Sequence, residues 1–319
     1  MTAAALSTDL VSNPPVPAGF DEPAFRRHVA HALRGRYRLV ELLGRGGMSV
    51  VYGADETPLG RRVALKILQP EFGDTLVNRE RFRREARVIA GFEHPGIVPI
   101  YTLGEAAGLP FFTMRWVRGR SLAARLEGSD ARMDVPAVCA LLTALADSLD
   151  AIHRAGIVHR DIKPANVLLD DSGAQPVLID FGVATVATSE QSRAEVARGF
   201  GTLEYMCPEQ ALGELESDAR GDIYSLGVLA FQALTGRLPF RGSSAREIIA
   251  QHVARPAPMV SVFRPDIPPA LDSAVARCLA KSPSDRWPSA AAARDAFRSA
   301  CVAGDATPRR PRLWRIFSR

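Results

Sequence analysis

The sequence predicts an α+β protein of two lobes, in which a small antiparallel sheet with one helix precedes a larger, mainly helical part. Three observations support this prediction. From residue 37 onward, strand-like runs surround a glycine-rich turn. Helical spacing interrupts these runs once, over residues 78–91. After Gly119 the pattern becomes helical, which leaves about 80 residues for the small lobe and places a hinge near 115–120.

Residues 1–36 are expected to form a flexible leader that contains one short helix. The first twenty residues or so hold three closely spaced prolines among small and polar side chains. The helix is expected over 22–34. Its apolar side chains recur every four residues, at Phe25, Val29 and Leu33.

The small lobe, expected over 37–115, consists of strand-like runs rich in β-branched and apolar residues. In chain order they read YRLVELLGRGGMSVVYGADE, which holds two strands, then RRVALKILQ, IVPIYTLGEA and LPFFTMRWV. The helix over 78–91 lies between the third and fourth of these strands.

The larger lobe, expected over 121–298, is built mainly from helices. VPAVCALLTALADSLDAIHRAG is a long apolar helix that Gly156 ends. Further helices are expected over 222–235, 245–254, 270–280 and 289–301. A ligand is expected in a cleft between the two lobes.

The composition excludes several classes of protein. Hydrophobic residues make up 47% and charged residues 24% of the 319 residues, as in globular rather than disordered proteins. No run approaches eighteen unbroken apolar residues, and the start lacks the basic and apolar regions of a signal peptide. We therefore expect a cytoplasmic protein.

A basic C-terminal tail is expected over 299–319, and the net charge of +5 comes from the end of this tail. Residues 309–319 hold five arginines and no acidic residue, so the rest of the chain is formally neutral. Specific nucleic-acid binding, which needs a basic face on the folded body, is therefore not expected. The tail also carries Trp314, Ile316 and Phe317, a mixture that suits weak contact with an anionic membrane surface. A solvated terminus is the alternative.

The four cysteines are scattered along the chain without CxxC spacing. They are Cys139, Cys207, Cys278 and Cys301. This distribution argues against a zinc site or a disulfide framework and agrees with a reducing compartment.

The first candidate for chemistry is the glycine-rich stretch between the first two strands. It comprises Gly44, Arg45, Gly46, Gly47, Met48, Ser49, Val50 and Val51. Glycines here would let backbone N–H groups approach phosphate oxygens, although this stretch alone also fits an ordinary hairpin turn. Its strand–loop–strand context excludes the Rossmann and Walker loops, which run from a strand into a helix.

A lysine supplies the second candidate. Lys66 lies in a strand that is apolar on both sides, so its charge points inward and needs a partner. Glu85, in the following helix, is a candidate for that partner. The chain holds only three lysines, and two of them fall in the candidate motifs.

The strongest segment is HRDIKPAN, which places Asp161, Lys163 and Asn166 on one tight turn. They offer a proton acceptor, a cation and a neutral metal ligand. Asp180, in a DFG tripeptide after a short apolar run, adds a second carboxylate. Together these oxygen ligands would suit magnesium.

Taken in order, these motifs resemble the protein-kinase signature, with a glycine-rich loop, VALK, HRDIKPAN, DFG and a later Pro-Glu pair. GTLEYMCPEQ and SDARGDIYSLGVLAFQALTGRLPF are most similar to bacterial serine/threonine kinases of the eukaryotic-like, or Hanks, type. The resemblance covers residues 37–298. It implies a bilobal protein-kinase fold and transfer of the ATP γ-phosphate to Ser/Thr hydroxyls of protein substrates, including this chain itself if it self-associates.

The resemblance also implies how nucleotide would bind. The stretch from Gly44 to Ser49 would cover the phosphates, and Lys66, paired with Glu85, would hold the α- and β-phosphates. The adenine ring would lie among Leu43, Val51, Ala64, Met114 and the backbone from Arg115 to Val117.

The remaining implied roles concern the transfer itself. Asp161 would orient the substrate hydroxyl and accept its proton, with Lys163 near the γ-phosphate. Asn166 and Asp180 would hold Mg²⁺, with Mn²⁺ as an alternative.

Three residues match structural positions of the family. Glu209 and Arg286 match a buried pair that braces the large lobe. Asp222 matches a helix residue that supports the catalytic turn.

The segment after DFG departs from related bacterial kinases, which often carry phosphorylatable threonines where this chain has Ala194, Glu195 and Val196. Glu195 could supply a fixed negative charge to Arg160, or it could simply be solvated.

Two functions remain open at this point. One is an active Mg·ATP-dependent kinase, and the other is a catalytically inactive kinase fold that acts as a scaffold or nucleotide sensor. Inactive relatives usually lack at least one residue of the polar set, whereas this chain has all five. These are Lys66, Glu85, Asp161, Asn166 and Asp180.

Overall fold

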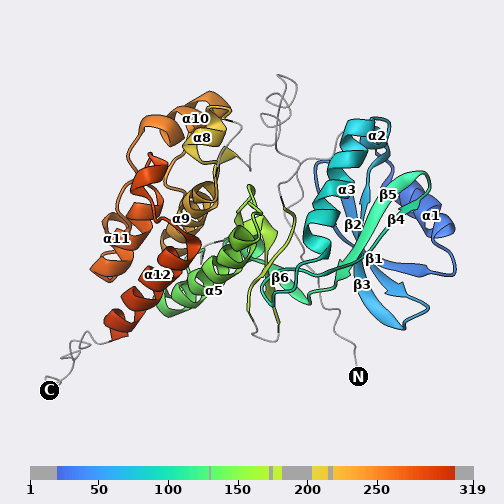
Figure 1. The fold of residues 1–319 in the computed structure, drawn as a ribbon, viewed down its shortest axis with the longest axis horizontal. Coiled ribbons are helices and arrows are strands. Elements are labelled where there is room, and N and C mark those ends of the chain that lie inside the picture. Colours follow the sequence, from blue (N-terminus) through green and yellow to red (C-terminus); the bar gives the residue numbers. More distant parts are fainter. Residues whose placement is uncertain (1–19, 129–130, 172–174, 182–202, 215–217, 306–319) are drawn as a thin grey trace, which may run out of the picture.

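The computed structural model of the chain describes residues 20–128, 131–171, 175–181, 203–214 and 218–305. It confirms the predicted architecture, because a sheet-rich lobe lies beside a larger helical lobe (Figure 1). Glu195 and its neighbours between DFG and Gly201, and the basic tail over 309–319, lie outside the described ranges.

The N-lobe sheet is antiparallel and has the strand order β1-β2-β3-β5-β4. Its strands are β1 (Tyr37–Arg45), β2 (Ser49–Glu56), β3 (Arg61–Leu68), β4 (Ile100–Ala106) and β5 (Leu109–Arg115). In the central strand β3, Val63, Leu65 and Ile67 join an apolar cluster on one face. Ala64 and Leu68 join a second cluster on the other face. Because both faces are covered, β3 is apolar from Val63 onward, apart from Lys66 near its end.

A helix covers each face of this sheet. α3 (Leu76–Ala90), preceded by the short α2 (Pro70–Gly73), packs Phe82 and Ala86 against the face that carries Lys66. α1 (Glu22–Ala32) lies on the opposite face, at the outer side of the lobe in Figure 1. The helix expected over 22–34 is therefore an integral part of the N-lobe core.

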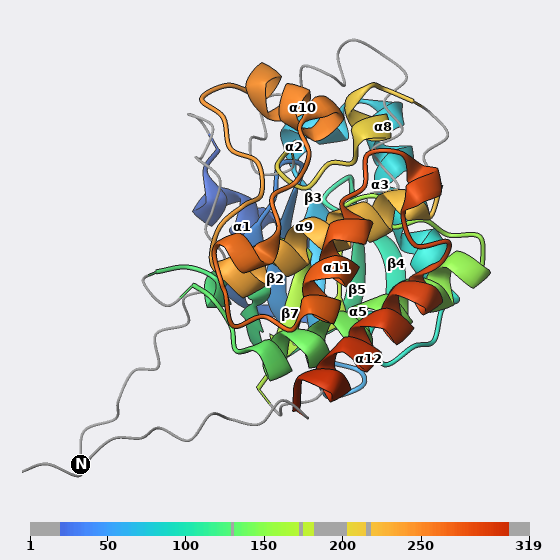
Figure 2. The ribbon, with the colours of Figure 1, turned by 90° about the vertical axis from the view of Figure 1, so that its left-hand side faces the viewer.

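The C-lobe is built around two long helices that its core cluster buries, α5 and α9. Its helices are α4 (Leu122–Arg125), α5 (Val135–Arg154), α8 (Pro208–Ala211), α9 (Arg220–Thr235), α10 (Ala245–Ala254), α11 (Pro269–Cys278) and α12 (Ala290–Asp305). Short 3-10 turns lie at η1 (Pro164–Asn166), η3 (Val260–Val262) and η4 (Pro283–Asp285). Figures 1 and 2 both show α12 running alongside α5.

A small sheet joins the hinge to the site-bearing turn. Its strands, in the order β6-β7-β8, are β6 (Gly119–Ser121), β7 (Val167–Asp170) and β8 (Val177–Leu178). Gly119 has a φ of 146°, and a Cβ there would overlap the carbonyl of Leu169. The close approach of β6 to β7 therefore requires glycine at this position.

One described helix, α5, is long and apolar enough on average to cross a membrane, although it contains no unbroken apolar run of that length. Half of its 18-residue apolar stretch is buried within the protein. Because α5 packs against α9 and α12, its apolar composition is explained by its place in the C-lobe core.

The cysteine expectation is wrong for one pair. Cys139 of α5 and Cys301 of α12 form a disulfide, although 162 positions separate them in the chain. The pairing depends on two helices that lie side by side, and spacing along the sequence does not reveal this. The free cysteines, Cys207 and Cys278, are both buried, and burial raises the pKa of each thiol.

The disulfide gives a direct chemical prediction. Protein purified without reductant and then denatured should expose two reactive thiols, and four after reduction. Cys301→Ser should lower the free energy of unfolding by about 2–4 kcal/mol under oxidising conditions, because the unfolded chain regains freedom. Under reducing conditions that difference should largely disappear. Four reactive thiols in the unreduced sample would contradict the pairing.

Candidate active site

Lys66 and two carboxylates from different elements meet where the lobes face each other. Lys66 Nζ lies 2.8 Å from Glu85 Oε1 of α3 and 2.8 Å from Asp180 Oδ1, which follows β8. Burial alone would lower the pKa of Lys66, but the Asp180 and Glu85 carboxylates more than offset this, so its pKa is raised. Lys66 therefore stays charged, and its ammonium group links the N-lobe to the C-lobe.

Of these three charged groups, the Glu85 carboxylate is the one whose ionised form is disfavoured by its surroundings. Its carboxyl group is buried, and burial raises its pKa to about 7 even though Lys66 opposes the shift. The ion pair therefore depends on a carboxylate that begins to protonate near neutral pH.

The turn before β7 brings three polar side chains together. Asn166 Nδ2 donates to the Asp161 backbone oxygen at 2.9 Å and to Asp161 Oδ2 at 2.8 Å. Lys163 Nζ lies 2.8 Å from the same Oδ2. No hydrogen bond from the described residues reaches Asp161 Oδ1. Asn166 and Lys163 thus hold one carboxylate oxygen of Asp161 in place.

Asp222 of α9 holds this turn through its backbone N–H groups. Its carboxylate accepts hydrogen bonds from the backbone N–H groups of His159 at 2.8 Å and Arg160 at 2.7 Å, and it contacts His153 Nε2 at 2.8 Å. Burial alone would raise the pKa of Asp222, but these partners hold it below its usual range. Arg160 has a φ of 65°, a strained conformation for a side chain of its size. The buried carboxylate therefore offsets the strain in the turn that carries Asp161.

The DFG phenylalanine fixes the segment that carries Asp180. Phe181 is buried and stacks on His159, with ring centroids 4.4 Å apart. Asp180 itself has a φ of 54°, so its backbone is also in the left-handed region. Both segments that supply carboxylates are thus packed against each other.

The glycine-rich stretch forms the hairpin between β1 and β2. The Gly46 N–H donates to Ser49 O at 2.8 Å. A third residue, Gln69, donates its side-chain amide to Gly46 O at 3.0 Å and Ser49 O at 3.3 Å. Nothing in the sequence marks Gln69, which follows β3 and becomes recognisable only when the hairpin is seen in three dimensions.

The predicted adenine-binding residues gather on one apolar face of the N-lobe. Ala64 and Met114 are buried in the cluster there, and partly buried Leu43, Met48, Val51 and Val117 pack against it. Val117, in the segment between β5 and β6, belongs to the residues that pack against this cluster. This face could cover a planar apolar ring.

The donor set also fits a divalent metal held together with phosphate. Asn166 directs its side-chain nitrogen to Asp161 and, at 3.4 Å, to the Asp180 backbone oxygen, so its side-chain oxygen would be the atom that binds a metal. Within the described ranges, no three His, Cys, Asp or Glu side chains cluster closely enough to hold a metal by themselves. Magnesium characteristically binds through one or two protein oxygens and completes its shell with phosphate and water.

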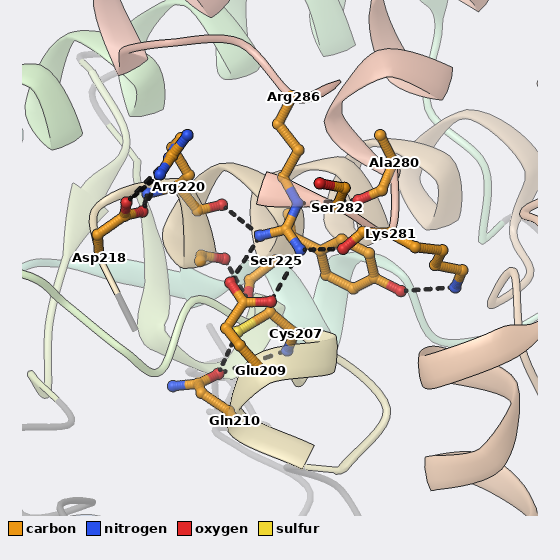
Figure 3. Close-up of polar contacts among 12 residues, drawn as sticks. Cys207, Glu209, Gln210, Asp218, Arg220, Ser225, Ala280, Lys281, Ser282 and Arg286 are labelled. Carbon is orange, nitrogen blue, oxygen red and sulfur yellow. Dashed lines mark hydrogen bonds and ion pairs between the residues drawn. The ribbon is translucent and has the colours of Figure 1, made fainter. Parts of the chain in front are cut away.

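A second polar centre braces the C-lobe away from this site (Figure 3). Arg286 donates to Glu209 twice, Nη1 to Oε1 at 2.7 Å and Nη2 to Oε2 at 2.8 Å. Its remaining donors reach the backbone oxygens of Ala280, Arg220 and Lys281 at 2.8, 3.0 and 2.9 Å. All five N–H donors of this buried guanidinium group are satisfied. The pair expected from the sequence is therefore present.

Comparison with known proteins decides the family. A family model described as protein kinase domain matches residues 37–297. The chain belongs to the protein kinase family. It is 41% identical over 258 residues to the serine/threonine-protein kinase PknH of Mycobacterium bovis, and 42% identical over 257 residues to PknD of Mycobacterium tuberculosis. These alignments cover 80% of this chain but 42% and 38% of the relatives, so the chain spans about two fifths of their length.

A solved protein-kinase structure agrees with this assignment. The PknI kinase domain of Mycobacterium tuberculosis matches with a TM-score of 0.65 and 31% identity, covering 83% of this chain and 96% of that one. The resemblance to bacterial Hanks-type kinases is therefore confirmed. The implied roles of the individual site residues remain predictions, although the structure brings together those that should act together.

The position of Glu85 in this kinase site gives a testable pH dependence. Because Glu85 must be ionised to hold Lys66, Mg·ATP affinity should weaken as the pH falls from 8 towards 6, through the pKa near 7. Glu85→Gln should reduce kcat/KM by up to about 100-fold, because Lys66 is misplaced. It should also remove the part of the pH dependence that Glu85 causes. Isothermal titration of Mg·ATP into both proteins across this pH range measures the affinity, and initial rates measure kcat/KM. Parallel pH profiles of the affinity in the two proteins would contradict the role of Glu85.

Proposed function

We propose that this chain is a protein serine/threonine kinase that transfers the γ-phosphate of ATP to Ser/Thr hydroxyls of proteins, including its own. The observation that carries the proposal is the linked polar set, in which Lys66 contacts both Glu85 and Asp180 while Asn166 and Lys163 hold Asp161. A scaffold would not require this arrangement, and no feature of the described residues favours one.

The residues of the chain divide the work by their chemistry. Asp161 would accept the hydrogen bond of the substrate hydroxyl, orient it, and take its proton as the hydroxyl oxygen bonds to the γ-phosphorus and the bond from that phosphorus to the β,γ-bridging oxygen breaks, which releases ADP. Lys163 neutralises Asp161 and the charge that develops nearby. Lys66 would hold phosphate oxygens, and Asn166 and Asp180 would hold Mg²⁺ or Mn²⁺. When bound, Mg·ATP supplies the phosphoryl group and the metal charge.

The test is direct transfer of label. The purified chain should incorporate phosphate from γ-labelled ATP into itself or a generic protein substrate, and EDTA should abolish this. Mass spectrometry should place the label on Ser or Thr. ATP binding without any labelled protein would instead support the scaffold.

Two finer predictions concern partners and location. If the chain phosphorylates itself between molecules, the initial rate per molecule should rise with protein concentration.

We also propose a cytoplasmic location and weak membrane contact through residues 309–319. Sedimentation with vesicles that contain phosphatidylserine tests the membrane contact. The full chain and a chain without residues 309–319 are compared, and equal sedimentation of the two would exclude this contact.

A further inference from the structure

The segment that precedes the family match is built into the lobe that would cover the nucleotide. The match begins at residue 37, whereas α1 spans Glu22–Ala32. Phe25 and Val29 of α1 are buried in the same apolar cluster as Leu65 of β3. The helix thus covers part of one face of the sheet.

Polar contacts tie α1 to the two strands that carry the glycine-rich hairpin. Arg26 Nη2 donates to Val40 O of β1 at 2.6 Å. The Tyr52 hydroxyl of β2 donates to Glu22 Oε1 at 2.9 Å. These contacts fix the helix relative to both arms of the hairpin.

Phe20, just before α1, reaches the hairpin itself. The Arg45 guanidinium carbon lies 4.0 Å from the Phe20 ring centroid, and the same ring packs on Phe25 at 5.3 Å. Arg45 in turn donates from Nε and Nη2 to Gln69 Oε1, at 3.1 and 2.8 Å. The aromatic ring therefore stabilises the arginine that contacts Gln69.

Gln69 joins both arms of the hairpin and is almost completely buried, with 1% of its surface exposed. Its side-chain nitrogen donates to Gly46 O and Ser49 O, and its backbone N–H donates to Met48 O at 2.8 Å. Because Arg45 occupies the amide oxygen, it directs the amide nitrogen towards these carbonyl groups. Arg45 thereby determines how Gln69 holds the loop.

We propose that Phe20, acting through Arg45 and Gln69, positions the glycine-rich hairpin, so that the segment before the kinase domain sets the affinity for nucleotide phosphates. Phe20 is a positioning residue. The effect on nucleotide rests on the proposed kinase function. The effect on the hairpin does not.

The first test needs no nucleotide. Phe20→Leu keeps apolar contact with Phe25 but removes the aromatic face. The Gly46 and Gln69 amides, which are bonded within the hairpin, should then exchange with solvent about three to ten times faster, while β3 amides exchange as before. Phe20→Tyr should behave like wild type.

Tyr101→Leu is the matched control, because Arg61 lies 4.0 Å from the Tyr101 ring centroid elsewhere in the same lobe. It removes an equivalent contact and should leave hairpin exchange unchanged. Unchanged exchange in Phe20→Leu, or an equal increase in Tyr101→Leu, would overturn the positioning role.

The second test measures the Kd for Mg·ATP. Phe20→Leu and Arg45→Ala should each weaken binding about threefold to tenfold, and the double variant should be no weaker than Arg45→Ala alone. Additive losses, or a looser hairpin with unchanged affinity, would overturn the link to nucleotide. Failure of the wild type to bind Mg·ATP would refute the proposed function and the nucleotide part, whereas amide exchange would still decide whether Phe20 positions the hairpin.

Discussion

Asp161→Asn is expected to reduce phosphoryl transfer by about 100-fold to 10,000-fold while leaving Mg·ATP affinity nearly unchanged. The substitution keeps the size of the side chain but removes its capacity to accept the proton of the substrate hydroxyl. Asn166 still donates to the Asp161 backbone oxygen, and Asp222 still holds the neighbouring N–H groups, so the turn should persist. Initial rates with labelled ATP and titration calorimetry of nucleotide binding measure the two effects separately.

Asp171→Asn is a suitable control for that experiment. It makes the same charge change on an exposed residue just after β7 and should alter the rate less than twofold. A rate for Asp161→Asn within tenfold of wild type would remove Asp161 from the proton transfer. A comparable fall in nucleotide affinity would indicate that the site itself had been disturbed.

Arg286→Met should destabilise the protein more than any other substitution named above, with a loss of about 3–5 kcal/mol in the free energy of unfolding. The change removes five hydrogen bonds and leaves the Glu209 carboxylate buried without its cation. For a lobe of this size, we expect the Tm to fall by roughly 6–20 °C. Differential scanning calorimetry measures both quantities.

Arg294→Met provides the comparison. Arg294 Nη1 lies 2.6 Å from Asp147 Oδ1, but the two side chains are 25% and 47% exposed, so solvent screens the pair. Its loss should cost at most about 1 kcal/mol. Replacing both members of the buried pair, with Glu209→Leu and Arg286→Met, should recover part of the stability. Equal small effects at Arg286 and Arg294 would show that burial does not govern the strength of these pairs.

Apolar periodicity predicted most of the helices and strands because these elements pack against one another in the core. The helix expected over 222–235 is found as α9, Arg220–Thr235, and that over 245–254 as α10, Ala245–Ala254. The inward charge of Lys66 followed from the apolar residues on both sides of it, and its pairing with Glu85 is present. The observed ends of some helices differ from the predicted ends because a capping residue sets them. α3, for example, begins after the N-cap residue Thr75 rather than at residue 78.

Contacts between distant segments account for what the sequence did not reveal. The Cys139–Cys301 bond, the contact between Lys66 and Asp180, and the grip of Gln69 on the hairpin all join separate elements. None of them produces a periodic signal. The motifs identified the polar residues of the site, but only the packing of the lobes shows how those residues restrain one another.

The disulfide also divides the chain mechanically. Cys139 and Cys301 close a covalent ring across 162 positions, and Asp161 and Asp180 lie within it, whereas Lys66 and Glu85 lie outside. Tension applied at the two ends of the oxidised chain therefore passes through the sulfur–sulfur bond and not through the residues between the two cysteines. These residues, which would extend by roughly 550 Å in the reduced chain, stay unstretched while the bond is intact. Only the N-lobe half of the site lies in the path of the load.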